Sequence, residues 1–131
     1  MTNESKVLSG KKGLVMGVAN DRSIAWGISK VAAEQGATLG FTYQGEALEK
    51  RVRPLAESIG SDLLLPCDVT NDDDLDRTFK EVEEKWGGID FLVHAIAFSD
   101  KSELDGLYLN TTRENFQRTM DISVYSFTAV A

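Results

Sequence analysis

The sequence has 131 residues, of which 42% are hydrophobic and 27% charged, and its formal net charge is −7. This is the composition of an ordinary globular protein, and the length leaves room for about one domain with a substantial core. The negative charge argues against a nucleic-acid partner or an anionic membrane, because both require a basic surface.

Targeting signals and metal-binding motifs are not evident in the sequence. No apolar run approaches the roughly 20 residues of a membrane span, and the polar N-terminus shows no signal-peptide pattern. The single cysteine, Cys67, excludes an internal disulfide and fits a reducing compartment, so we expect a cytoplasmic protein. Because only one histidine accompanies that cysteine, no metal site built by the protein is expected.

The first predicted unit is a strand, a turn and a helix. Residues 13–18 (GLVMGV) form a short apolar run that is typical of a strand buried on both faces. A polar turn follows, and then Ile24, Ile28 and Val31 recur at helical spacing. Such a unit can hold a phosphate at the start of the helix, where unpaired N–H groups and the positive end of the helix dipole face the anion.

Three small residues of this unit are candidates for phosphate binding. Gly17 would let the backbone approach a pyrophosphate closely, Ser23 would cap the helix or donate to a phosphate, and Gly27 would let helix and strand pack tightly. The usual dinucleotide fingerprint G-x-G-x-x-G is absent, and its place is taken by G-x5-S-x3-G. From these residues alone, a structural turn and a ligand site are equally good interpretations.

Three further pairs of strand and helix follow. The apolar patterns predict strands over residues 37–43, 63–65 and 89–95, and helices over residues 46–59, 70–86 and 111–127. Pro54 should kink the second helix or split it in two. The last helix should begin at a capping box of Thr111 and Glu114, and its stripe of Phe116, Met120, Val124 and Phe127 should cover the sheet.

The alternation of strands and helices predicts an α/β fold with a doubly wound parallel sheet and right-handed crossovers. We expect the strand order 3-2-1-4, which leaves the fourth strand at an edge. Ligands of such sheets bind beyond the carboxyl ends of the strands. The residues there are Gln44, Asp68, Val69 and residues 96–99.

Each of these residues also has an interpretation without a ligand. Gln44 can be a turn residue before Gly45, and Asp68 can be an acid placed at the start of a helix. His94 is the only histidine and invites a catalytic role. Because it lies within a buried strand pattern, we interpret it as a packed, hydrogen-bonded structural residue instead.

Six separated stretches resemble, in order, the bacterial NADH-linked enoyl-acyl-carrier-protein reductases of the short-chain dehydrogenase/reductase superfamily. They are residues 17–27 (GVANDRSIAWG), 41–46 (FTYQGE), 50–55 (KRVRPL), 67–69 (CDV), 92–98 (LVHAIAF) and 126–131 (SFTAVA). The resemblance covers residues 9–131. It implies that residues 1–131 are the N-terminal, cofactor-binding part of one Rossmann-fold domain, with NAD as the cofactor. It further implies the reduction of trans-2-enoyl-acyl-carrier-protein in type II fatty acid biosynthesis, by a homo-oligomer that is a tetramer in the family.

The resemblance also assigns roles to individual positions. It implies that Gly17, Ser23 and Ile24 meet the pyrophosphate, Gln44 the adenosine ribose, Asp68 and Val69 the adenine, and Ile96 and Ala97 the ribose and nicotinamide side. Ala97, Phe98 and Ser99 should border the acyl substrate, Phe98 through its side chain and Ser99 through its backbone.

The resemblance does not supply a proton donor in this sequence. The family protonates its enolate with a tyrosine and a lysine spaced Y-x6-K, in which the tyrosine bonds the thioester oxygen and the lysine holds the cofactor ribose. Tyr43 and Lys50 have this spacing, but they lie at the adenosine end, and we reject them. We therefore assign no catalytic residue here and expect the pair beyond Ala131.

Two other functions remain open at this point. A ketoreductase would share the fold and cofactor, but the N-A-G motif of such enzymes is replaced by Ala95-Ile96-Ala97. A nucleotide-binding module without chemistry would also fit the residues present. A Y-x6-K motif in the next roughly 40 residues would indicate the reductase, a Y-x3-K motif a general dehydrogenase, and neither a binding module.

Overall fold

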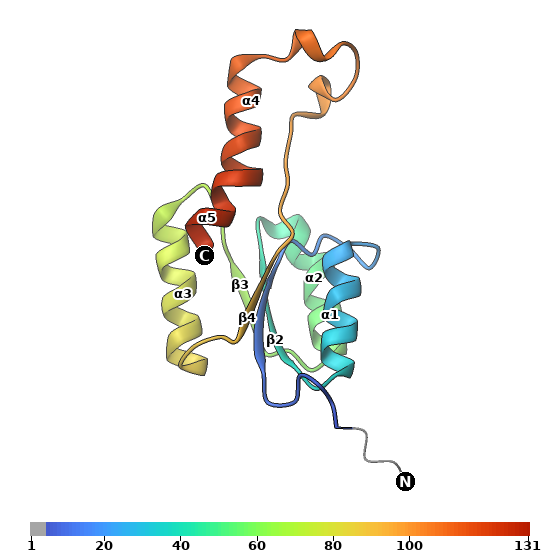
Figure 1. The fold of residues 1–131 in the computed structure, drawn as a ribbon, viewed down its shortest axis with the longest axis vertical. Helices are drawn as coiled ribbons and strands as arrows, with labels where there is room; N and C mark the ends of the chain where they lie inside the picture. The colour runs from blue at the N-terminus through green and yellow to red at the C-terminus, as the bar shows by residue number, and fades with distance from the viewer. Residues whose placement is uncertain (1–4) are drawn as a thin grey trace.

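The computed structural model describes residues 5–131 and contains one parallel sheet (Figure 1). Its strands are β1 (Lys12–Met16), β2 (Thr38–Tyr43), β3 (Leu63–Pro66) and β4 (Phe91–His94). They lie in the order β3-β2-β1-β4, and all three neighbouring pairs are parallel. The predicted order is confirmed, and β4 is an edge strand.

Helices cover both faces of the sheet. They are α1 (Ile24–Glu34), α2 (Glu46–Ser58), α3 (Asp72–Trp86), α4 (Arg113–Met120) and α5 (Ser126–Val130), and a π-helical segment, Asp121–Tyr125, joins the last two. Two short 3₁₀ turns, Lys101–Glu103 and Tyr108–Asn110, interrupt the loop before α4. Figure 1 shows α1 and α2 on one side of the sheet, and α3 with α5 on the other. The doubly wound arrangement is therefore confirmed.

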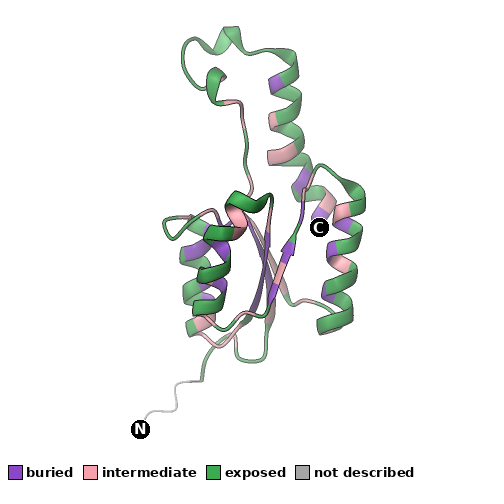
Figure 2. Ribbon diagram, turned by 180° about the vertical axis from the view of Figure 1, so that it is seen from behind, coloured by how far each residue is buried: buried purple, intermediate pink, exposed green. Residues whose placement is uncertain are grey.

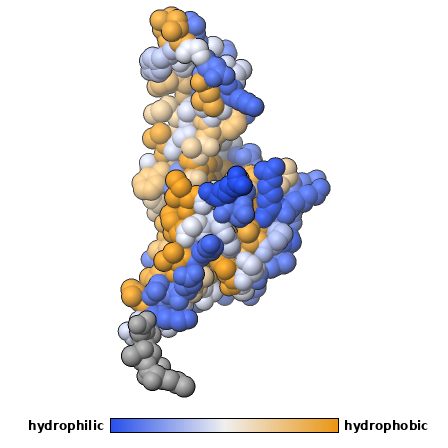
Figure 3. All heavy atoms as spheres, turned by 90° about the vertical axis from the view of Figure 1, so that its right-hand side faces the viewer, coloured by the Kyte–Doolittle hydropathy of each residue, from blue (hydrophilic) through white to orange (hydrophobic). Residues whose placement is uncertain are grey.

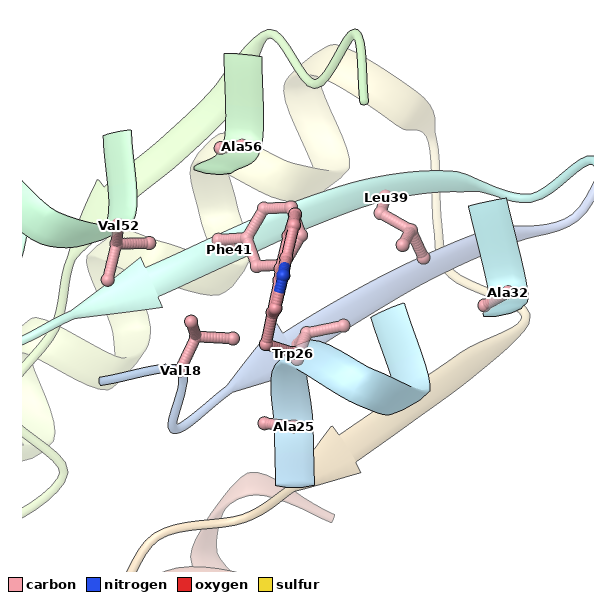
Figure 4. Packing of buried hydrophobic residues seen from close by; sticks show 9 residues of the cluster. Val18, Ala25, Trp26, Ala32, Leu39, Phe41, Val52 and Ala56 are labelled. Atoms are coloured by element: carbon pink, nitrogen blue, oxygen red, sulfur yellow. The ribbon is translucent and has the colours of Figure 1, made fainter. Parts of the chain in front are cut away.

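Two apolar clusters fill the space between the sheet and its helices. On the α1–α2 side, Trp26 packs against Phe41 with ring centroids 6.3 Å apart (Figure 4). Val15 belongs to this cluster, whereas its neighbours Leu14 and Met16 belong to the cluster under α3. Because successive residues of a strand face opposite sides, both faces of β1 are buried, as its continuous apolar run predicts.

The helix predicted from the spacing of Ile24, Ile28 and Val31 is present, but these residues are not its buried side. Ile24 is 82% exposed, and Ile28 and Val31 are exposed as well. The helix instead buries small residues together with one large ring, Ala25, Trp26, Ser29 and Ala32. Small residues let the helix approach the sheet closely, and the Trp26 ring fills the remaining space. Figure 3, which views the molecule from the α1 side, shows apolar atoms on this surface.

The structure contradicts the packing role predicted for Gly27 and the alternative that Pro54 splits α2 in two. A Cβ on Gly27 would meet no atom within 4 Å, so this glycine is not needed for tight packing. Pro54 neither ends nor splits α2, which runs continuously from Glu46 to Ser58. Pro54 lies on the exposed face of α2, where water can hydrate the carbonyl that the missing N–H leaves without a partner.

The start of α4 differs by one residue from the prediction. Its N-cap is Thr112, whose hydroxyl accepts from the Asn115 N–H at 3.2 Å. Glu114 does not complete a capping box with Thr111. Instead, Glu103 in the preceding loop bonds to the N-cap residue. Its carboxylate accepts from the Thr112 N–H and from the Thr112 hydroxyl, each at 2.8 Å. The reciprocal bond of the capping box is thus supplied across the loop.

The apolar stripe of the last helix does not cover the sheet. Phe116, Met120, Val124 and Phe127 are all between 42% and 59% exposed. Figures 1 and 2 show that α4 extends away from the sheet and is mostly exposed. The predicted packing of this stripe is therefore wrong, and the side that α4 buries is polar, beginning with Asn115.

Candidate functional site

A cavity of about 600 Å³ opens at the carboxyl ends of the strands. Its walls come from all four strand ends and from the helix that follows the long loop. They are formed by Gly17, Val18, Ala19, Thr42, Tyr43, Gln44, Leu48, Cys67, Asp68, Val69, Thr70, Ala95, Ile96, Ala97, Phe98, Arg118, Asp121 and Ile122. Seven of the ten residues predicted for the site line this cavity; Ser23, Ile24 and Ser99 do not.

The turn after β1 depends on Gly17 for a reason that the sequence does not reveal. Gly17 has φ +117°, and a Cβ on it would overlap the backbone carbonyl of Ala95. The Ala95 N–H also donates to the Met16 carbonyl at 2.8 Å, which extends the pairing of β1 and β4. The glycine therefore lets the ends of two strands come together, in addition to exposing its backbone to the cavity.

Ser23 precedes α1 at the N-cap position, but its side chain does not bond to the helix. Its Oγ accepts from the N–H groups of Ala19 at 2.9 Å and Asn20 at 3.0 Å, and so it closes the turn behind it. Since the hydroxyl accepts twice, its own proton remains available to a ligand. Ile24 points its side chain to solvent, so only its backbone N–H, at the open end of the helix, can serve an anion.

At the end of β2, Tyr43 and Gln44 line the cavity, and an ion pair of α2 affects the titration of Tyr43. Glu49, in the first turn of α2, pairs with Arg53 at 2.6 Å. Burial, followed by the Glu49 carboxylate, raises the pKa of Tyr43, and the bond to Arg53 lowers the pKa of Glu49. The Tyr43 hydroxyl thus stays protonated.

Asp68 fits both of the interpretations that the sequence allows. Its Oδ1 accepts from the Thr70 N–H at 2.9 Å and from the Thr70 hydroxyl at 2.7 Å, as in a turn that precedes a helix. The actual N-cap of α3 is Asn71, however, whose side chain accepts from the Asp74 N–H at 3.1 Å. Asp68 is therefore not consumed in capping α3, and its Oδ2 remains available at the cavity wall beside Val69.

The end of β4 places Ile96, Ala97 and Phe98 in the wall, whereas the side chain of Ser99 turns toward α4. The Ser99 Oγ accepts from Asn115 Nδ2 at 3.1 Å. The structural interpretation of His94 is confirmed: its Nε2 lies 2.7 Å from Ser126 Oγ, and its ring meets Phe127 edge-on with centroids 5.5 Å apart. Ser126 is fully buried.

Several residues of the cavity wall were not predicted from the sequence. Thr42 and Cys67 lie at strand ends and could have been included by position alone. Arg118, Asp121 and Ile122 follow β4 by more than twenty residues, and no local pattern marks them as part of a site. Burial raises the pKa of the Cys67 thiol, which therefore stays protonated and is a poor nucleophile.

The described part of the chain has neither a cluster of metal-binding side chains nor a helix that could span a membrane. Within residues 5–131, no group of three or more histidine, cysteine, aspartate or glutamate side chains could hold a metal ion. Over that range no helix combines the length and the apolar character that crossing a membrane requires.

A parallel sheet ordered β3-β2-β1-β4, with a cavity beyond the strand ends and a glycine turn before the first helix, defines a nucleotide-binding α/β protein of the Rossmann type. A family model described as enoyl-(acyl carrier protein) reductase matches residues 17–131. The chain therefore belongs to the enoyl-acyl-carrier-protein reductase family.

Individual relatives agree with this assignment. The chain is 61% identical over 131 residues to the enoyl-[acyl-carrier-protein] reductase [NADH] 1 of Rhizobium meliloti, covering 100% of this chain and 48% of the relative. The crystal structure of FabI from Candidatus Liberibacter asiaticus has a TM-score of 0.93 at 53% identity, covering 95% of this chain and 48% of that one. A reductase from Anaplasma phagocytophilum, crystallised with NAD, has a TM-score of 0.90 at 53% identity, covering 94% and 47%. The chain spans about half the length of the relatives that it matches.

Proposed function

We propose that this chain forms the NADH-binding part of an enzyme that reduces trans-2-enoyl thioesters carried by acyl carrier protein, in type II fatty acid biosynthesis. The observation that carries the proposal is that Gly17, Gln44, Asp68 and Ile96, from four different strand ends, line one cavity. The names of the relatives, which are NADH-dependent enoyl reductases, support the choice of reaction.

The residues present suit a dinucleotide. The Ser23 proton and the open N–H groups at the start of α1 are donors suited to a pyrophosphate, and Gly17 presents bare backbone to it. Gln44 can donate to and accept from ribose hydroxyls. Asp68 can accept from the exocyclic amine of adenine, with Val69 against the ring. NADH would supply the hydride, and this chain would bind and orient it.

Selectivity for NADH over NADPH is expected from the end of β2. A 2′-phosphate needs a cation beside Gln44. Arg53, on the following helix, is already paired with Glu49 at 2.6 Å. Lys50 and Arg51 lie a turn or more into α2. The segment after β2 therefore offers a neutral amide where a phosphate would need positive charge.

The substrate would lie on the β4 side of the cavity, against Ala97, Phe98 and Ser99. The groups expected to stabilise and protonate the enolate are a tyrosine and a lysine beyond Ala131, and none of the residues described here is assigned to that step. The contribution proposed for this chain is to hold the cofactor, with its nicotinamide near Ile96, and to border the acyl substrate.

We further propose a cytoplasmic homotetramer. The exposed apolar stripe of α4 and the segment after it supports an interface between copies, because such a stripe is unfavourable in water. Sedimentation of the full-length protein, compared with a variant carrying Phe116→Ser and Val124→Ser, tests this assembly. A parent protein that sediments as a monomer would refute it.

The reaction is tested with the full-length protein, NADH and a short trans-2-enoyl thioester, by following the loss of NADH absorbance. Reduction of the enoyl thioester, but not of a 3-ketoacyl thioester, is the expected result. Preferential reduction of the ketoacyl thioester would instead indicate a ketoreductase, and NADH binding without turnover of either thioester a binding module. Either result would overturn the proposal.

A further inference from the structure

The polar side of the last helix is hydrogen-bonded to one short segment of the loop after β4. Asn115, Thr119 and Ser123 follow one another at intervals of four residues, so their side chains lie on one side of the helix. Each of them makes hydrogen bonds to the segment formed by Phe98, Ser99 and Asp100. We call these three the clamp residues, and the segment they bind the substrate strip.

The clamp bonds both ends of the substrate strip through its backbone. At one end, Ser123 Oγ accepts from the Phe98 N–H at 3.0 Å and donates to the Phe98 carbonyl at 3.2 Å. At the other end, Asn115 Oδ1 accepts from the Asp100 N–H at 2.9 Å. Side-chain bonds of this kind replace the ladder that a neighbouring strand would otherwise provide.

The middle of the substrate strip is held through its side chain. Ser99 Oγ lies 3.1 Å from Asn115 Nδ2 and 3.1 Å from Thr119 Oγ1, and Thr119 Oγ1 is also 3.4 Å from Asn115 Oδ1. Asn115 is only 4% exposed, so this is a buried amide whose oxygen and nitrogen both make hydrogen bonds. A polar network around a buried amide is costly when broken, and it favours one arrangement of its members.

Arg118, on the same helix, reaches the substrate strip as well. Its guanidinium lies over the Phe98 ring, 4.6 Å from the centroid, and 3.3 Å from Asp100 Oδ1. Four side chains of one helix therefore contact three consecutive loop residues. Because the apolar stripe of α4 faces away from the sheet, polar bonds rather than apolar burial fix the helix against the strip.

We propose that Asn115, Thr119 and Ser123 are positioning residues that hold the substrate strip in place at the cavity for the enoyl substrate. This rests on the proposed function, since Phe98 and Ser99 of the strip are expected to border the acyl chain. Within residues 5–131, the side-chain hydrogen bonds of the clamp residues go to the loop after β4 and to the helix itself, and none goes to a wall residue on β1, β2 or β3. Loosening the clamp therefore weakens thioester binding and leaves NADH binding unchanged.

The test uses single substitutions in the full-length protein that remove one hydroxyl. Thr119→Val keeps the side-chain shape, Ser123→Ala is small, and Thr119→Ser and Ser123→Thr restore the hydroxyl. Gln117→Ala, at an exposed position on the same helix, is the matched control. We expect Thr119→Val and Ser123→Ala to raise the KM for a short enoyl thioester about tenfold, the effect of roughly one hydrogen bond. The KM for NADH should stay within about twofold, and the hydroxyl-bearing variants should behave like the parent.

Amide hydrogen exchange measures the clamp without any turnover. The Phe98 amide should exchange about tenfold faster in Ser123→Ala than in the parent or Gln117→Ala, because its acceptor is gone. Unchanged exchange at Phe98 overturns the proposal, and so does an equal rise of both KM values, which would indicate general destabilisation. If the Phe98 amide exchanges as expected in the parent protein and in Ser123→Ala, but the parent does not reduce enoyl thioesters, the proposed function is overturned. The hydrogen bonds of the clamp residues would then still be supported.

Discussion

Replacing Gly17 by alanine tests how the cavity is built. The φ of +117° is a conformation that costs a residue with a Cβ about 1–3 kcal/mol. The new Cβ would also lie 2.5 Å from the Ala95 carbonyl carbon, and moving that backbone costs about 1–3 kcal/mol more. The expected loss is therefore about 2–6 kcal/mol, a large part of the roughly 5–15 kcal/mol that stabilises a typical domain.

The same substitution ten residues later provides the control. Gly27 lies in α1, has open space where a Cβ would be, and is exposed, so Gly27→Ala should stabilise the protein by about 0.5–1 kcal/mol through helix propensity. Urea unfolding followed by circular dichroism measures both variants. If Gly17→Ala unfolds within about 0.5 kcal/mol of the parent, the close approach of the two strand ends is not what requires the glycine.

Three further outcomes follow from the site and the loop. Gln44→Arg should narrow the preference for NADH over NADPH in kcat/KM, because it adds the cation that a 2′-phosphate needs; an unchanged ratio would contradict the assignment of Gln44. Bonds from the backbone and hydroxyl of Thr112 lower the pKa of Glu103, so its stabilising effect is present above about pH 4.5 and is lost as the pH falls through the lower folded value. Glu103→Gln should thus reduce the acid sensitivity of urea unfolding midpoints, with no change in sensitivity counting against it. A polypeptide of residues 1–131 alone should show no NADH oxidation with an enoyl thioester, and turnover by a monomeric, cooperatively melting polypeptide would refute this.

The sheet could be predicted because its determinants are local and repeated. Each strand is a short apolar run bounded by glycine or polar residues, and right-handed crossovers then restrict the strand order. The face of α1 could not be predicted in this way. A periodicity count treats Ile24 and Val31 as core, whereas the sheet accepts Ala25 and Ser29, whose small size allows a close approach.

The residues of the candidate site also divide into those that the sequence predicts and those that it does not. Gln44 and Asp68 follow strands directly, and parallel strands bring their carboxyl ends to one edge, so position in the sequence was enough to find them. Arg118 and Ile122 reach the cavity only because the loop after β4 returns the chain to it. Nor does any local pattern show that Ser23 bonds the turn before it, since the usual N-cap bond runs into the helix.

The helix from Arg113 to Val130 has an unusual distribution of polarity. Asn115 and Ser126 are buried, whereas Phe116 and Phe127 are at least half exposed, although one edge of the Phe127 ring meets His94. An isolated surface helix arranges these the other way round. If the clamp residues hold one side of this helix and a second copy of the protein covers its apolar side, the helix is held on both sides. If the proposed assembly forms through the apolar stripe, the contact between copies therefore restrains the same helix that holds the substrate strip, and assembly and thioester binding become linked through α4.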